Sequence, residues 1–447
     1  MQTLFYGREL LLKELPKDCD LEHLNLAIKP TYIKKEGKSF CKRCQMVMTP
    51  VNRTGCICGG PCAYCRYCIQ MGKVTKCAKF YHLPEPNAFE QRTEKLLFWQ
   101  GTLSPQQKEA SKKIIETIQK KQTRLLWAVA GSGKTEMLFE GIEYALKQNK
   151  RVGIVSPRVD VCLELAPRLQ DAFPNTPLAL LYGGMEKPYA YTQLVLATTH
   201  QLFRFHEAFD VLIIDEVDAF PFRVDKSLKY AATKACKKDA SLIYLSATPS
   251  QEMQESVKNK KLLATILPAR YHGHPLPVPK AKLCFNWRNK ILKKFLKTSF
   301  GKELETRLKN NRKCLIFVPN IQWMLKFEKV LRKLYPKIPF QSVSAEDPLR
   351  KEKVYEMRQG KLQWLLTSTI LERGVTFPNI DVLVVGAEDR IFTVSALVQI
   401  AGRAGRSPKY PTGDVLFFHN GQSKALKKAI KQIKQMNHLA KERGLVE

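Results

Sequence analysis

One stretch predicts the fold of this chain: Leu125-Leu126-Trp127-Ala128-Val129-Ala130-Gly131-Ser132-Gly133-Lys134-Thr135. Its apolar run is typical of a buried strand, its glycines are typical of a tight turn, and the residues that follow are compatible with a helix. A backbone that turns in this way presents its N–H groups, aided by the helix dipole, to an anion. The stretch therefore predicts a triphosphate site between a strand and a helix.

The residues of the turn have separate expected roles. Lys134 is expected to reach the β- and γ-phosphates of ATP, and Thr135 is expected to ligate Mg²⁺. The strict motif has glycine where this chain has Ala128, so a chance Gly-Lys-Thr turn is the alternative interpretation. The expected phosphate-binding residues are Gly131, Ser132, Gly133, Lys134 and Thr135.

The composition indicates a polyanionic partner. The formal net charge is +33 over 447 residues, whereas the hydrophobic content of 44% is ordinary for a soluble protein. This length is too great for one hydrophobic core and predicts two or three domains. No run approaches the roughly 18 apolar residues of a membrane span, and the N-terminus lacks the apolar core of a signal peptide. We therefore expect a cytoplasmic protein that binds nucleic acid.

The cysteines are clustered. Eight of the thirteen lie within residues 41–77. Because cytosolic thiols stay reduced, two CxxC knuckles about twenty residues apart predict one tetrahedral Zn²⁺ site, with unliganded buried thiols as the alternative. Cys41 and Cys44 form the first knuckle. Two pairs compete for the second knuckle: Cys62 with Cys65, and Cys65 with Cys68.

After the phosphate loop, apolar strands alternate with helical segments, as in a parallel sheet covered on both faces. The strand 211–214 delivers Asp215 and Glu216 to its carboxyl end, where open α/β sheets bind their ligands. Asp215 is expected to hold Mg²⁺, and Glu216 is expected to polarise the water that attacks the γ-phosphate. Further strands are expected at 151–155, 194–197 and 242–245.

A second α/β pattern follows a proline-rich stretch at 267–280, which is typical of an interdomain linker. This pattern has no phosphate loop of its own. Arg403 and Arg406 suit an arginine finger for a transferring phosphoryl group, with a surface basic patch as the alternative. The expected elements are strands at 314–318, 364–366 and 382–385, a helix at 321–334, and a lysine-rich C-terminal helix from Ser423.

This ordered series of motifs resembles that of superfamily 2 helicases. The resemblance implies two RecA-like domains with ATP between them, adenine recognition by Gln107 and nucleotide binding by Gly374. It also implies γ-phosphate sensing by Arg403 and Arg406. Two departures from the RNA-helicase branch favour DNA: Asp-Glu-Val-Asp at 215–218, and a glutamine at 399 in place of histidine.

In this chain, zinc knuckles precede the helicase-like motifs. This order, together with the segments 64–68, 156–165 and 370–378, is similar to the pattern of the ComFA family of competence proteins in Gram-positive bacteria. The resemblance implies an ATP-driven motor on single-stranded DNA that helps to draw transforming DNA across the membrane. It also implies ComFC and the channel protein ComEC as partners, at the inner face of the cytoplasmic membrane. The implied zinc ligands are Cys41, Cys44, Cys65 and Cys68, so Cys56 and Cys58 are expected to matter less.

The expected fold class is α/β, with two RecA-like domains preceded by a small four-cysteine zinc module. A primosomal restart helicase is one alternative, but its cysteines interrupt the helicase domains instead of preceding them. A zinc-dependent DNA-binding scaffold is the other, although a structural nucleotide site needs neither Glu216 nor an arginine finger. The expected divisions are an N-terminal segment at 1–37, the zinc module at 38–82, and RecA-like domains at 83–268 and 281–447.

Overall fold

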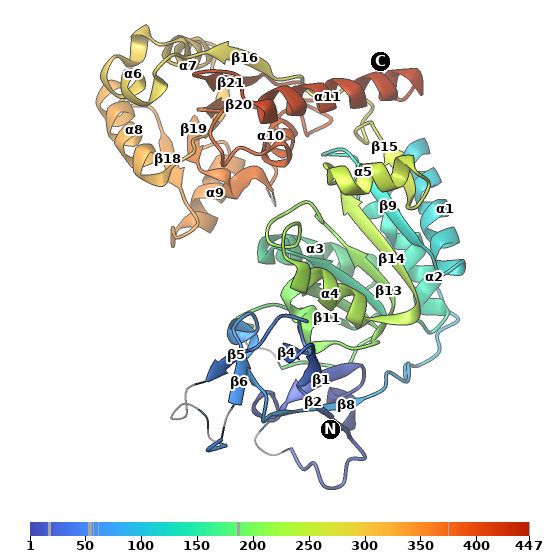
Figure 1. The fold of residues 1–447 in the computed structure, drawn as a ribbon. Coiled ribbons are helices and arrows are strands. Elements are labelled where there is room, and N and C mark those ends of the chain that lie inside the picture. The colour runs from blue at the N-terminus through green and yellow to red at the C-terminus, as the bar shows by residue number, and fades with distance from the viewer. Residues whose placement is uncertain are drawn as a thin grey trace. The chain divides into compact units, whose positions relative to one another are not determined.

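The computed structural model describes residues 1–16, 19–51, 56, 58–60, 62–185, 188–373 and 375–446. The chain divides into two units, each with its own α/β sheet (Figure 1). The first unit comprises Met1–Thr102, Lys108–Leu126 and Thr135–Thr265, and the second comprises Leu103–Gln107, Trp127–Lys134 and Ile266–Glu447.

The first large sheet has seven strands in the order β11-β12-β10-β13-β14-β9-β15. β10 (Val152–Ser156) pairs in parallel with β12 (Leu194–Thr198) and β13 (Phe209–Ile214), and all three are almost fully buried. Burial on both faces explains their continuous apolar sequences. The other strands are β9 (Thr123–Ala128), β11 (Leu178–Leu181), β14 (Cys236–Ser246) and β15 (Leu263–Leu267).

Helices cover this sheet on both sides, as the parallel α/β pattern predicts. α1 (Pro105–Gln119) begins at a proline, a residue that is favoured in the first helical position. The remaining elements are η4 (Glu136–Leu138), α2 (Phe139–Lys147), α3 (Val159–Ala172), η5 (Thr199–Arg204), α4 (Lys226–Ala235) and α5 (Gln251–Lys258).

The second large sheet has six strands in the order β16-β21-β20-β17-β19-β18, and every neighbouring pair is parallel. Its strands are β16 (Lys280–Leu283), β17 (Lys313–Phe317), β18 (Phe340–Val343), β19 (Trp364–Thr367), β20 (Ile380–Val385) and β21 (Val415–His419). Its helices are α6 (Trp287–Lys293), η6 (Phe295–Lys297), α7 (Ser299–Lys309), α8 (Ile321–Leu334), α9 (Arg350–Arg358), η7 (Thr369–Glu372), α10 (Val394–Ala401) and α11 (Lys424–Glu442).

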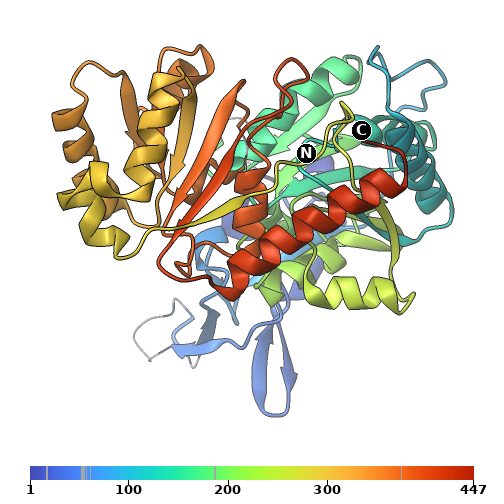
Figure 2. The same ribbon diagram turned by 90° about the horizontal axis from the view of Figure 1, so that it is seen from above.

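The C-terminal helix α11 is long (Figure 2). Its buried residues lie on one face, so the helix is amphipathic. The Ser423 side chain caps it by accepting a hydrogen bond from the backbone N–H of Leu426. Leu426 and Ile433 are buried in a core shared with α10. All six lysines of α11 are exposed: Lys424, Lys427, Lys428, Lys431, Lys434 and Lys441. No helix in the described ranges is long and apolar enough to cross a bilayer.

The N-terminal residues form three small antiparallel sheets. β8 (Lys79–Leu83) lies between β1 (Arg8–Leu11) and β2 (Ala27–Pro30), so residues before position 37 share a sheet with residues that directly follow the cysteine-rich segment. The other elements are η1 (Gln2–Leu4), η2 (Leu12–Glu14), β3 (Tyr32–Lys35), β4 (Lys38–Cys41), β5 (Thr49–Val51), β6 (Cys62–Cys65), η3 (Ile69–Met71) and β7 (Val74–Thr75).

A close backbone approach attaches this N-terminal region to the rest of the first unit. Gly7 has a φ of +63°, and a Cβ there would lie 2.7 Å from the Cβ of Ala208. The backbone N–H of His206 donates to the Gly7 carbonyl at 2.9 Å. Only glycine allows this conformation and this proximity together.

Three buried carboxylates of the N-terminal residues also bind cations from the sheet domain. Glu9 pairs with Lys234, Glu14 pairs with Arg204, and Glu85 pairs with Arg151. Glu14 additionally pairs with Arg43, which lies between Cys41 and Cys44, and the exposed fractions of the two side chains are 8% and 0%. Glu14 thereby connects the first cysteine knuckle to η5.

We predict that Glu14→Ala lowers the free energy of unfolding of the first unit by about 3 kcal/mol. The substitution leaves Arg43 buried without its carboxylate, and breaking a buried pair costs roughly 3–5 kcal/mol. Urea unfolding followed by fluorescence measures the change. The exposed Glu22→Ala is the control and should shift stability by less than about 0.5 kcal/mol. Equal midpoints for the two variants would contradict the prediction.

The same pair predicts a direction for the pH dependence. Burial alone would raise the pKa of Glu14, but the Arg43 charge and other partners outweigh burial and lower this pKa. A carboxylate whose folded-state pKa is lowered stabilises the fold above its unfolded pKa, and this contribution disappears as the pH falls through the folded value. The difference between wild type and Glu14→Ala should therefore shrink on acidification.

Candidate nucleotide and metal sites

The phosphate loop follows β9 and precedes η4 and α2, as the sequence predicts. Gly131 and Gly133 have φ angles of +82° and +71°, in a region that residues with a Cβ rarely adopt. The backbone N–H of Ser132 donates to the Val129 carbonyl at 3.2 Å and closes the turn. The loop thus has the strand–turn–helix context that phosphate binding requires.

The interior of the loop fits a phosphate group. Ser132 is fully buried, and its hydroxyl has no hydrogen-bond partner among the described residues. A buried hydroxyl is normally satisfied, so one without a protein partner indicates a place for a ligand oxygen. ATP with a divalent metal fits this donor set.

Gln107 connects the start of α1 to the phosphate loop. Its side-chain oxygen accepts a hydrogen bond from the Ser104 N–H at 2.8 Å, which is half of a capping box. Its side-chain amide donates to the Gly133 carbonyl at 3.1 Å. The structure therefore places Gln107 against the loop backbone, while its recognition of adenine remains a prediction.

Arg270 is a residue of this region that sequence reasoning missed. Its guanidinium is buried and donates to the carbonyls of Ala404, at 2.8 Å, and Gly405. The next residue, Tyr271, donates its N–H to the Gly131 carbonyl at 3.0 Å. The proline-rich stretch has no helix or strand from residue 268 to 279, as expected, yet it contacts the phosphate loop directly.

Two positively charged side chains, Arg270 and Arg406, interact with each other in this region. Burial, together with the charge of Arg406, lowers the pKa of Arg270 to about 9. A bound anion would offset both effects, because an opposite charge favours the charged form of a group. Arg270 therefore places a buried positive charge next to Gly131 of the phosphate loop. The single arginine in a loop gave no sequence signal for this role.

The predicted carboxylates lie at the carboxyl end of β13. The Asp215 N–H donates to the Val155 carbonyl, and the Glu216 N–H donates to the Asp215 carboxylate, both at 2.8 Å. Glu216 has a φ of +54°, which is uncommon for a residue with a side chain and is frequent at functional sites. The residue expected to polarise the attacking water, Glu216, therefore has a left-handed backbone conformation.

Asp218 fixes this segment to the end of β14. Its two carboxylate oxygens accept hydrogen bonds from the hydroxyls of Ser246 and Thr248, each at 2.7 Å. All three side chains are buried. Ser246 and Thr248 lie 28 and 30 residues after Asp218 in the sequence, so only the fold shows that the three residues form one network.

Arg403 and Arg406 lie against the segment that follows η7. Arg403 is 4% exposed and donates to the backbone carbonyls of Glu372, at 2.6 and 2.9 Å, and Val375. Arg406 is more accessible and donates to the Thr376 hydroxyl at 2.9 Å. Gly374, expected to bind nucleotide, lies outside the described residues.

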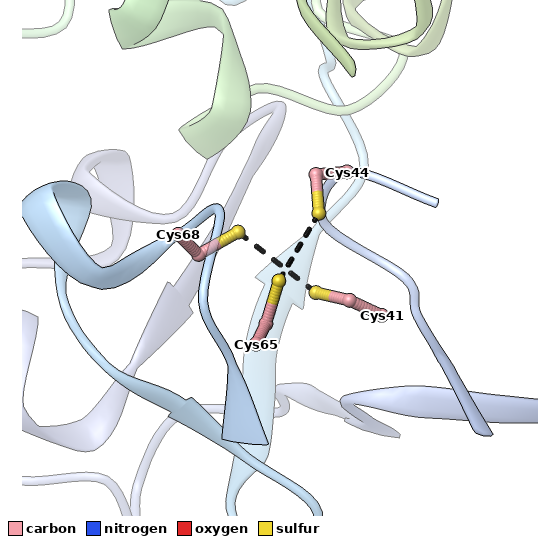
Figure 3. A group of neighbouring side chains, drawn as sticks. All are labelled: Cys41, Cys44, Cys65 and Cys68. Atoms are coloured by element: carbon pink, nitrogen blue, oxygen red, sulfur yellow. Dashed lines mark hydrogen bonds between the residues drawn. The ribbon is translucent and has the colours of Figure 1, made fainter. Parts of the chain in front are cut away.

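The four cysteines implied by the family resemblance converge (Figure 3). Cys41 ends β4, Cys65 ends β6, and their partners follow in tight turns. The Sγ atoms of Cys44 and Cys65 are 3.3 Å apart, and those of Cys41 and Cys68 are 3.9 Å apart. Tetrahedral Zn–S bonds of about 2.3 Å place the sulfurs about 3.8 Å apart, so these buried thiols fit Zn²⁺.

Family models match three segments of the chain. Residues 1–82 match the competence protein ComFA N-terminal domain. Residues 100–251 match the res subunit of type III restriction enzymes, and residues 288–408 match the helicase conserved C-terminal domain. The two helicase-type matches indicate an ATPase of the helicase type.

Solved structures show the same fold. The DEAD-box helicase Mss116 bound to single-stranded RNA and UDP-BeF superposes with a TM-score of 0.55 at 18% identity, over 74% of this chain and 77% of that one. At this identity the likeness concerns the fold, which is the parallel-sheet RecA-like α/β fold expected from the sequence.

Two curated relatives are much more similar. Competence protein ComFA of Bacillus subtilis (strain 168) is 46% identical over 377 residues, which are 84% of this chain and 81% of the relative. Competence protein ComFA of Streptococcus pneumoniae (strain ATCC BAA-255 / R6) is 41% identical over an alignment of 450 positions, which covers 99% of each chain. The chain belongs to the ComFA family of competence proteins.

Proposed function

We propose that this protein is a DNA-dependent ATPase that moves along single-stranded DNA and drives the uptake of transforming DNA across the cytoplasmic membrane. The observation that carries the proposal is a phosphate loop with two left-handed glycines, in a chain of the ComFA family. The buried Ser132 hydroxyl and the cationic surroundings of Arg270 support a triphosphate ligand.

The residues that hold and hydrolyse ATP divide into three groups. The loop 131–135 binds the phosphates, and Thr135 and Asp215 hold Mg²⁺, which shields phosphate charge when bound. Glu216 orients the attacking water, because its carboxylate comes directly after Asp215. Arg406 and Arg403 supply positive charge to the transferring phosphoryl group, with Arg406 the more accessible of the two.

Charge and exposed lysines support single-stranded DNA as the substrate of the motor. The net charge of +33 favours an anionic partner, and six exposed lysines of α11 add to the basic surface. In this role the protein is cytoplasmic and peripheral at the inner face of the membrane, with ComFC and the ComEC channel as partners. Zn²⁺ on Cys41, Cys44, Cys65 and Cys68 stabilises the N-terminal module.

We predict that Lys134→Ala abolishes ATP turnover and leaves the melting temperature unchanged. Lys134 is a partly exposed loop residue whose charge acts on phosphates rather than on packing, so kcat should fall at least about 10²-fold. Phosphate release and thermal melting on one preparation measure both effects. The exposed Lys112→Ala in α1 is the control and should keep wild-type turnover. Wild-type turnover in Lys134→Ala would refute the site.

The two arginines should behave differently. Arg406→Ala should keep its melting temperature and lose DNA-stimulated hydrolysis by about 10³-fold, the usual loss for an arginine finger. Arg403→Ala should also lower the melting temperature, because Arg403 occupies buried backbone carbonyls that would be left unsatisfied. Melting curves and stimulated phosphate release test this; unchanged turnover in Arg406→Ala would count against the assignment.

Binding to single-stranded DNA should depend little on sequence and weaken steeply with salt. Each phosphate contacted by lysine or arginine contributes a slope of roughly −0.7 to log K against log salt, and base stacking adds sequence-tolerant affinity. Fluorescence anisotropy with two labelled oligonucleotides of unrelated sequence measures this response. A flat salt dependence, or strong preference for one oligonucleotide, is the result that this prediction excludes.

A further inference from the structure

A second group of four cysteines lies beside the first. The sulfur atoms of Cys56, Cys58, Cys62 and Cys77 all lie within 4.8 Å of one another. Cys56 Sγ is 3.5 Å from Cys77 Sγ and 3.3 Å from Cys58 Sγ. We propose that Cys56, Cys58, Cys62 and Cys77 bind a second zinc ion, which revises the expectation that Cys56 and Cys58 matter less.

The pairing of β6 with β7 brings two of these cysteines together. In the observed register Tyr64 pairs with Thr75 and Cys65 pairs with Val74. The Lys76 N–H donates to the Ala63 carbonyl at 2.8 Å and extends the ladder. Two residues beyond the first of these pairs, the same register aligns Cys62 with Cys77. Cys56 and Cys58 then approach from the connection between β5 and β6.

The strand β6 supplies one ligand to each group. Cys62 is its first residue and Cys65 is its last. Side chains three positions apart on a strand point to opposite faces, and a rise of about 3.3 Å per residue separates the two positions by about 10 Å. Cys62 and Cys65 therefore cannot bind the same metal ion. Cys65 belongs with Cys68 in the first group, and Cys62 belongs to the second group.

The spacing fits zinc better than a disulfide. A disulfide requires sulfurs about 2.05 Å apart, whereas four thiolates around one Zn²⁺ are about 3.8 Å apart. The Thr75 hydroxyl lies 3.3 Å from Cys77 Sγ and can donate to a thiolate, as groups around metal ligands commonly do. Four thiolates without a metal would repel one another.

The two groups differ in exposure. The cysteines of the first group are 0–1% exposed, whereas Cys58 and Cys77 of the second are exposed to solvent. Solvent access lets a competing ligand reach the metal. The second zinc ion should therefore leave first when a chelator is added, and the first should leave slowly.

Metal analysis of the full-length protein tests the proposal. Wild type should contain two zinc ions per chain, while Cys56→Ser and Cys77→Ser should contain one. Cys19→Ser is the matched control, since Cys19 belongs to neither group and should leave two zinc ions. One zinc ion in wild type, iron in place of zinc, or two zinc ions in Cys77→Ser would overturn the proposal.

A measurement on wild type alone covers the case in which the variants fail to fold. Co²⁺ added to the metal-free protein should increase the thiolate-to-cobalt charge-transfer absorbance up to two equivalents. Zinc release from the native protein to a coloured chelator should occur in two phases of equal amplitude. Saturation at one equivalent, or a single release phase of one zinc ion, would contradict a second site.

Discussion

The backbone N–H groups of the phosphate loop can surround an anion because the chain adopts a left-handed conformation, which residues with a Cβ rarely adopt. Gly131 and Gly133 allow that conformation directly after the buried strand β9, so the position of the loop is fixed by the sheet. The neighbouring contacts follow from it. Gln107 donates to one carbonyl of the loop and Tyr271 donates to another, so both the helix before the strand and the stretch after β15 are tied to the same turn.

The N-terminal region is attached by a different kind of interaction. Glu9, Glu14 and Glu85 hold cations of the sheet domain in buried pairs, and each pair is costly to break once formed. Glu14 also holds Arg43, which lies between Cys41 and Cys44. The first cysteine knuckle is therefore connected, through Arg43 and Glu14, to the domain that carries Asp215 and Glu216.

Local sequence patterns predicted the buried strands that end in motifs, but not the equally buried strand β21 (Val415–His419). The helix expected at 321–334 is α8 (Ile321–Leu334), and the strands that end in the motifs were found within a few residues, except that β14 begins six residues earlier than expected. The edge strand β11 was not predicted, since its short apolar run Leu-Ala-Leu-Leu is not followed by a motif. Arg270 could not be found from spacing, because its partners lie more than a hundred residues away. Cys77 was not predicted as a ligand either, because only the register of β6 and β7 aligns it with Cys62.

We propose above that ATP hydrolysis moves this protein along single-stranded DNA. The most direct measurement is the displacement of streptavidin from one biotinylated end of a single-stranded oligonucleotide. We expect ATP to accelerate displacement from one end over the other, and ADP to have no such effect. Equal displacement rates with ATP and with ADP at both ends would contradict the claim, even if the protein bound the DNA tightly.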